Sequence, residues 1–312
     1  MKAIPYIGNG PYCYANSVAM LLDSIGESIS PAKVEVLSGV GIGACLLTKD
    51  KLLFFNTYAG APDTGISRAL EILGFNYEEK SSERSDFNPF DQLRKNLNES
   101  PVVLGPLDMG YLKYNPRSES LYGVDHFVLV YGIDNNNAYF HDPAGFPCVS
   151  IPIKDLAEAW KAENIGYRRN YYRYWTKPAR VKQPKGKEIY DQAIQFFRSL
   201  YQESHDIAVK EKRVIDNDAI MTIIERLKNG NISSIEKDHL THFALPLGAK
   251  RALDFASFFS PHNAVLTDLK QKQAQLFGRC HALVMNNDWK ESSKSLEEFA
   301  TVEKEFRNRL MN

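Results

Sequence analysis

The sequence has few cysteines and no excess of charge of either sign. Its 312 residues contain four cysteines, Cys13, Cys45, Cys148 and Cys280. No two of them are close enough in sequence for a metal knuckle, and four are too few for a dense disulfide framework. Lys plus Arg and Asp plus Glu both number 38, so no overall field favours nucleic acid or anionic lipid. We therefore expect free thiols and no nucleic-acid partner.

Long apolar runs are also missing. The first residues, MKAIPYIGNGPYCYA, lack the apolar stretch of a signal peptide, and no run in the chain is long enough to cross a bilayer. There is no Walker-type loop, and GVGIG lacks the strand-turn-helix context of a dinucleotide site. The sequence thus predicts a cytoplasmic protein with no membrane partner, no bound metal and no cofactor.

The first half of the chain combines early helices with later strands. Apolar residues recur at helical spacing over 12–26, 64–74 and 88–98. From 101 onward, compact apolar runs separated by turn residues predict a β-meander that leads into the helix KDLAEAWKAE. Early helices followed by an antiparallel sheet define an α+β domain, which we place at residues 1–176.

The second half has a different pattern. Residues 177–186 are rich in Pro, Lys and Gly and are interpreted as a linker. Beyond them, five segments have helical spacing: 187–204, 214–229, 248–259, 264–284 and 288–310. We therefore predict an all-helical C-terminal domain over 187–312.

Cys13 differs from the other cysteines because it begins the first predicted helix. A cysteine nucleophile reacts as its thiolate, and a helix N-terminus stabilises an anion through unpaired backbone N–H groups and the helix dipole. His126 opens a strand, where its imidazole can act as base and acid for the thiol. Asp142 ends the next strand. Because the hairpin turns at 135–137, Asp142 is expected beside His126, where it would hold the ring in the correct tautomer.

Each of these residues also has a purely structural interpretation. A free cysteine often packs in a core, an Asp before Pro often marks a turn, and a histidine at a strand start is often only hydrogen-bonded. The order along the chain favours catalysis, because papain-like sites place Cys on an early helix, His at a strand start and a carboxylate on the paired strand. We therefore predict a Cys13–His126–Asp142 site.

The second oxyanion donor is harder to identify. Papain-like sites combine the N–H of the nucleophile with a side-chain amide shortly upstream, and only Asn9 in IGNGPYC qualifies by type. Asn16, one turn after Cys13, is interpreted as a helix-surface or loop-bracing residue. His141 and Asp125 alternate away from the predicted site, and His141 is interpreted as structural.

Five segments resemble a known family: CYANSVAMLLDSIGESIS, LSGVGIGACLL, PVVLGPLDMGYLKYN, DHFVLVYGIDNNNAYFHDP and IPIKDLAEAW. Over about residues 10–165 the chain looks like the N-terminal domain of butirosin biosynthesis protein H, a papain-like family of natural-product gene clusters. The resemblance implies transfer of an acyl or aminoacyl group from an acyl carrier protein's phosphopantetheine thioester to a small-molecule amine or hydroxyl acceptor. It implies Cys13, His126 and Asp142 as catalytic residues. Family members often have His before the cysteine, where this chain has Tyr12.

Two other functions stay open at this point. The same residues would serve a papain-like cysteine peptidase or amidase, and a catalytically idle binding protein could use the same cleft. In the helical domain, four polar residues are interpreted as surface positions of amphipathic helices: His239, His242, His262 and Asp254. The Tyr/Arg stretch 167–175 could dock a carrier protein, but its alternation is more typical of a strand with one solvated face.

Overall fold

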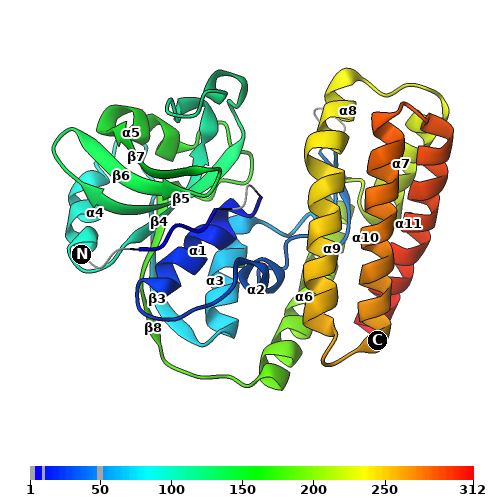
Figure 1. Ribbon diagram of the computed structural model, residues 1–312, viewed down its shortest axis with the longest axis horizontal. Coiled ribbons are helices and arrows are strands. Elements are labelled where there is room, and N and C mark those ends of the chain that lie inside the picture. Colours follow the sequence, from blue (N-terminus) through cyan, green and yellow to red (C-terminus); the bar gives the residue numbers. More distant parts are fainter. Residues whose placement is uncertain (1–3, 9–10, 48–51) are drawn as a thin grey trace. The chain divides into compact units, whose positions relative to one another are not determined.

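The computed structural model describes residues 4–8, 11–47 and 52–312, which fold as two compact units (Figure 1). The first, here called the sheet unit, comprises the chain up to Ser38 and Pro62–Pro184. The second, the helical unit, comprises Gly39–Ala61 and Lys185–Asn312. Residues 39–61 therefore fold with the C-terminal helices, whereas the sequence placed them in the domain spanning 1–176.

Over its described residues, the sheet unit contains one antiparallel sheet and five helices. Across the sheet the strands are β3 (Phe75–Ser82), β8 (Tyr171–Arg180), β4 (Val102–Asp108), β5 (Asp125–Ile133), β6 (Asn137–Asp142) and β7 (Phe146–Pro152). The helices are α1 (Cys13–Asp23), α2 (Pro31–Leu37), α3 (Pro62–Ile72), α4 (Phe90–Leu97) and α5 (Ile153–Lys161), with 3-10 turns at Met109–Tyr111 and Ser118–Ser120. The predicted α+β class with an antiparallel sheet is confirmed.

Helices pack on both faces of this sheet. Val128 of β5 belongs to the apolar cluster that includes Trp160 of α5. Phe127 points to the opposite face, because successive strand residues alternate, and its ring meets Tyr14 of α1 edge-on, 5.8 Å between centroids. The Ser17 hydroxyl donates to the Phe127 carbonyl at 3.3 Å. Helix α1 thus packs against β5, the strand that carries the predicted catalytic residue His126 near its start.

Two strands differ from the sequence analysis. Strand β3 was not predicted, because Glu78, Glu79 and Lys80 interrupt any apolar alternation, as is common for an edge strand. Strand β8 lies between β3 and β4, and its residues 172–176 are all buried. The sequence analysis favoured a strand with one solvated face for the Tyr/Arg stretch. This prediction is wrong for residues 172–175, because neighbouring residues cover both faces of the strand there.

The helical unit contains six helices and a hairpin in the part of the chain that the structure describes. They are α6 (Gly186–Glu211), α7 (Asp216–Lys228), α8 (Ser234–His239), α9 (Leu245–Phe259), α10 (Ala264–Met285), α11 (Trp289–Met311), β1 (Cys45–Leu47) and β2 (Leu52–Phe54). A π-turn, Leu240–Ala244, joins α8 to α9. Helices α7, α9, α10 and α11 run side by side (Figure 1). Among the described residues, no helix has the length and apolar character needed to cross a membrane.

The described residues of the segment Gly39–Ala61, which are 39–47 and 52–61, pack onto these helices. Gly39 has φ 72°, and a Cβ there would lie 2.4 Å from Cδ1 of Leu200 on α6, so both its conformation and its surroundings require glycine. The Phe55 ring packs edge-on against two aromatic side chains, with centroids 4.5 Å from Phe277 and 5.0 Å from Phe299. Residues of the segment thus complete the core of the helical unit.

A buried carboxylate also holds the segment. Glu303 on α11 accepts hydrogen bonds from the Gly43 N–H at 3.1 Å, the Tyr201 hydroxyl at 2.7 Å and the Gln273 amide at 2.6 Å. Buried carboxylates are tolerated when hydrogen bonds compensate for the loss of water. Glu303 therefore links the segment to three helices of its unit.

We expect Phe55→Ala to lower the free energy of unfolding by about 3–5 kcal/mol, because it removes a buried ring and leaves a cavity. Chemical denaturation of the full chain measures this loss. Leu47→Ala in the same hairpin is the matched control, since Leu47 is 44% exposed, and should change the value by less than about 0.5 kcal/mol. Equal effects of the two substitutions would contradict the packing of Phe55 in this core.

Candidate active site

Cys13 is the first residue of α1 and is half-buried. The residue before it, Tyr12, is buried and has a left-handed backbone, φ 70° and ψ 40°. This conformation is uncommon outside glycine and recurs at functional sites. It turns the chain into the helix so that the cysteine stands at the helix N-terminus, as the sequence predicted.

His126 and Asp142 are in direct contact. The His126 Nε2 atom and the Asp142 Oδ1 atom are 2.6 Å apart, and both side chains are buried. The β5–β6 register pairs Leu129 with His141, which puts Asp142 level with Val128, one diagonal step from His126. Diagonal neighbours on one face are within reach of long side chains. The contact expected across the hairpin is therefore present, although the two residues are not directly opposite.

The Asp142 carboxylate is fully buried and has three donors. Oδ1 accepts from the Ala144 N–H at 2.7 Å as well as from His126, and Oδ2 accepts from the Tyr114 hydroxyl at 2.5 Å. Burial alone would raise the pKa of Asp142, but the charge of His126 and these hydrogen bonds outweigh it and lower the pKa. Asp142 is thus an ionised carboxylate at neutral pH.

The environment of His126 favours its protonated form. Burial acts to lower the pKa of His126, but the Asp142 carboxylate opposes this with both charge and a hydrogen bond, and the Cys13 thiol adds the same two contributions. The net effect raises the pKa of His126 well above its usual value. Because Nε2 contacts Asp142, Nδ1 is the ring nitrogen left for the thiol. His126 therefore contacts Asp142 directly, and its pKa also depends on Cys13.

The remaining residues considered around this site have structural contacts or lie outside the described part. Asn9, predicted as the oxyanion donor, lies outside the described residues. Asn16 is buried, and its amide donates to the Pro11 carbonyl at 2.9 Å, which braces the loop before Cys13. His141 has Nε2 3.2 Å from the Ile4 carbonyl, and its Nδ1 accepts from the Cys148 N–H at 3.2 Å.

The Tyr/Arg stretch is largely engaged within the sheet unit. The Tyr167 hydroxyl donates to Asp125 at 2.7 Å, and Arg169 donates to the buried Asp63 at 2.7 Å. Arg168 stacks on the ring of Tyr171 at 3.9 Å. Because these side chains contact neighbours in their own unit, the stretch serves to hold the loop between α5 and β8.

His239, His262 and Asp254 contact their own unit, and His242 is exposed. His239 has Nε2 2.8 Å from the Leu53 carbonyl, His262 packs on Tyr190 at 4.6 Å, and Lys250 pairs with Asp254 at 3.1 Å. The described residues contain no group of three or more His, Cys, Asp or Glu side chains that could hold a metal ion.

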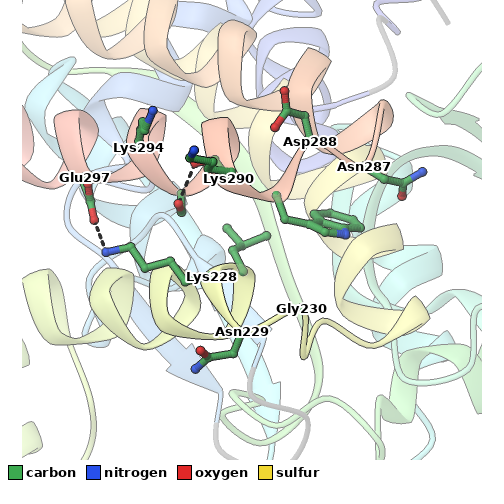
Figure 2. A pocket seen from close by; sticks show the side chains of 11 residues that line it. Lys228, Asn229, Gly230, Asn287, Asp288, Lys290, Lys294 and Glu297 are labelled. Carbon is green, nitrogen blue, oxygen red and sulfur yellow. Dashed lines mark hydrogen bonds and ion pairs between the residues drawn. The ribbon is translucent and has the colours of Figure 1, made fainter.

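The helical unit also has an open pocket of about 760 Å³, where the end of α7 meets the start of α11 (Figure 2). Trp289 and Lys290 line it, and an ion pair between Lys228 and Glu297 crosses its edge. None of the predicted site residues lies in this pocket, and its charged side chains have both signs. Sequence reasoning did not identify it, because its residues come from two helix ends without a recognisable motif.

Comparisons with known proteins identify the family. The chain is 42% identical over 306 residues to the uncharacterized protein YobF of Bacillus subtilis (strain 168), covering 98% of each chain. A family model described as the YobF C-terminal domain matches residues 210–311, within the helical unit. The chain therefore belongs to the YobF family.

Among the solved structures that resemble part of the chain is one from Bacillus anthracis. It is a crystal structure of a protein assigned as a C39-like peptidase, with 17% identity and a TM-score of 0.38. The alignment covers 59% of this chain and 98% of that chain. A likeness of this strength supports no conclusion about activity, so the site must be interpreted from its own geometry.

We expect histidine NMR to give His126 a titration midpoint above about 6.5, the usual histidine value, and above those of His141 and His239. Burial lowers the pKa of those two residues. Asp142→Asn removes the carboxylate charge and should lower the His126 midpoint by about 1–3 units.

The same shift has a consequence for stability. The folded pKa of His126 lies above the unfolded value, so protonation of His126 adds to the free energy of unfolding. This stabilisation is fully present below about pH 6.5 and is lost as pH rises through the folded pKa. A wild-type midpoint for His126 below that of His141 would contradict the contact geometry.

Proposed function

We propose that the sheet unit is a cysteine-dependent acyltransferase that works through an acyl-cysteine at Cys13. The observation that supports this best is the position of His126, whose Nε2 is held 2.6 Å from the buried Asp142 while the Cys13 thiol interacts with the same ring. A fixed imidazole between a thiol and a carboxylate is the arrangement that nucleophilic catalysis by cysteine requires.

The reaction has two half-reactions. The Cys13 thiolate attacks the acyl carbonyl, the new S–C bond forms, and the leaving group takes a proton from the His126 imidazolium. An acceptor amine or hydroxyl then attacks the acyl-cysteine and gives its proton to His126, and the Cys13 thiolate leaves. The backbone N–H groups at the start of α1 would stabilise the oxyanion in both steps.

The donor and acceptor follow from the resemblance to butirosin biosynthesis protein H. We propose a carrier-protein phosphopantetheine thioester as donor and a small-molecule amine or hydroxyl compound as acceptor. Hydrolysis shares the first half-reaction. With water in place of the acceptor the thioester would be hydrolysed, and with an amide in place of the thioester as well the protein would be a peptidase or amidase. Exclusion of water at the second step decides between the two outcomes.

Alkylation kinetics should distinguish Cys13 from the other thiols. Burial raises the pKa of Cys45 and of Cys280 to about 12, whereas Cys148 is exposed. At about pH 6, iodoacetamide should modify Cys13 roughly tenfold faster than Cys148, despite its lower exposure, because an adjacent imidazolium favours a thiolate. Peptide mass spectrometry gives both rates in one sample. Faster modification of Cys148 would indicate an idle cleft.

Acylation should be visible directly. Incubation with short acyl thioesters of pantetheine should add the mass of the acyl group to the wild-type protein, and Cys13→Ala should abolish the adduct. Cys148→Ala is the matched control and should retain it. Loss of the adduct to an added amine supports transfer, whereas loss to water and rapid cleavage of peptides would favour a peptidase. No adduct with any thioester donor would exclude the proposed function.

A further inference from the structure

The Tyr114 hydroxyl has a fixed place beside the carboxylate of the site. Tyr114 lies in the loop between β4 and β5, and its ring packs edge-on against Phe140 and Phe146, with centroid distances of 5.3 and 5.6 Å. Phe140 and Phe146 lie on β6 and β7, the two strands that flank the Asp142 turn. The packing therefore sets the 2.5 Å hydrogen bond from Tyr114 to Oδ2 of Asp142.

Tyr114 keeps its proton in this position. Burial and the neighbouring Asp142 carboxylate both raise the pKa of the Tyr114 hydroxyl. The hydroxyl is therefore a permanent donor at neutral pH, and it acts on the ionised form of Asp142. In turn it helps to lower the pKa of Asp142.

A second tyrosine contacts the same residue in a different way. The Tyr6 hydroxyl donates to the backbone carbonyl of Asp142 at 2.9 Å and accepts from the Gly145 N–H at 3.0 Å. Tyr6 thus holds the backbone of the turn, whereas Tyr114 contacts the charge. The two residues allow a structural effect on Asp142 to be separated from an electrostatic one.

We infer that Tyr114 is a positioning residue that tunes His126 through the Asp142 carboxylate. With Tyr114 present, the carboxylate charge is shared among three donors, the third being the Ala144 N–H. Without it, Oδ2 would lose its donor and the charge would act more strongly on the imidazolium. An imidazolium held too tightly is a weaker acid toward the leaving group. The catalytic part of this role rests on the proposed function.

In the described part of the chain, few charged and titratable groups act on the pair. Cys13 on α1 and Asp142 on β6 act on His126, and Tyr114 from the β4–β5 loop acts on Asp142. Tyr6, from the segment before α1, is affected by the charge of Asp142. The charge of Cys13 also acts on Tyr167, whose hydroxyl donates to Asp125, the residue before His126.

The test is histidine NMR on the full chain. Tyr114→Phe keeps the ring but removes the donor, and it should raise the His126 titration midpoint by about 0.5–1 unit. Tyr6→Phe should leave the midpoint in place, because it removes only a backbone contact. Tyr111→Phe, in the same loop as Tyr114, should have no effect on either the midpoint or the activity. An unchanged or lower midpoint in Tyr114→Phe, or an equal rise in Tyr6→Phe, would overturn the inference.

A second replacement at position 114 tests whether the His126 midpoint can also be lowered. Site-specific incorporation of 3-fluorotyrosine at position 114 keeps the ring and makes the hydroxyl a stronger donor, so the His126 midpoint should fall. This keeps the inference testable even if Tyr114→Phe does not fold. A rise instead of a fall would overturn it.

The acyl thioester assay separates this inference from the proposed function. Tyr114→Phe should form the Cys13 adduct about 3- to 30-fold more slowly than wild type, less than the roughly 10²- to 10⁴-fold that a general acid itself contributes, because Tyr114 acts on His126 only through Asp142. Wild-type protein that forms no adduct, combined with the expected NMR shifts, would reject acyl transfer but uphold the effect of Tyr114 on His126. An adduct on wild-type protein, combined with no shift of the His126 midpoint in Tyr114→Phe, would support acyl transfer but reject the effect of Tyr114 on His126.

Discussion

The buried hydrogen bond between His126 and Asp142 is the contact on which the site depends. Removing two ionisable groups from water is costly, and such a pair persists only when further hydrogen bonds satisfy the carboxylate. Here the Ala144 N–H and the Tyr114 hydroxyl complete the set. The strands β5 and β6, their register and the turn after Asp142 all serve to bring these donors together. The contact with Asp142 thus fixes the orientation of the His126 ring that Cys13 would use as its base.

The sequence was sufficient to place Cys13, His126 and Asp142 because each residue lies near the end of a strongly patterned element. Hydrophobic periodicity located α1, β5 and β6, and the hairpin brought two of the residues together. Tyr114 was missed because it lies in an irregular loop, where no spacing rule applies and only aromatic packing fixes its position. Strand β3 was missed for a related reason, since charged residues at a sheet edge erase the alternation on which strand prediction relies.

The helical unit is built from two separate stretches of the chain. Its helices were clear from periodicity, yet the sequence did not show that Gly39–Ala61 folds with them, because this association depends on long-range contacts such as those of Phe55 and Glu303. Membership of the YobF family extends over both units, with 98% of the chain aligned. In the helical unit, His239 contacts a carbonyl, His262 packs on a ring and Asp254 pairs with a lysine, so these three residues have structural contacts.

The insertion of Gly39–Ala61 between α2 and α3 affects how such a protein can evolve. A domain added at the end of a gene can be lost by a single truncation. Here the chain passes from one unit to the other after Ser38, after Ala61 and after Pro184, so a truncation before α6 would leave Phe55 and its neighbours without their partners. Loss of the helices would have to coincide with deletion or redesign of the loop between α2 and α3. The two units are therefore expected to be inherited together.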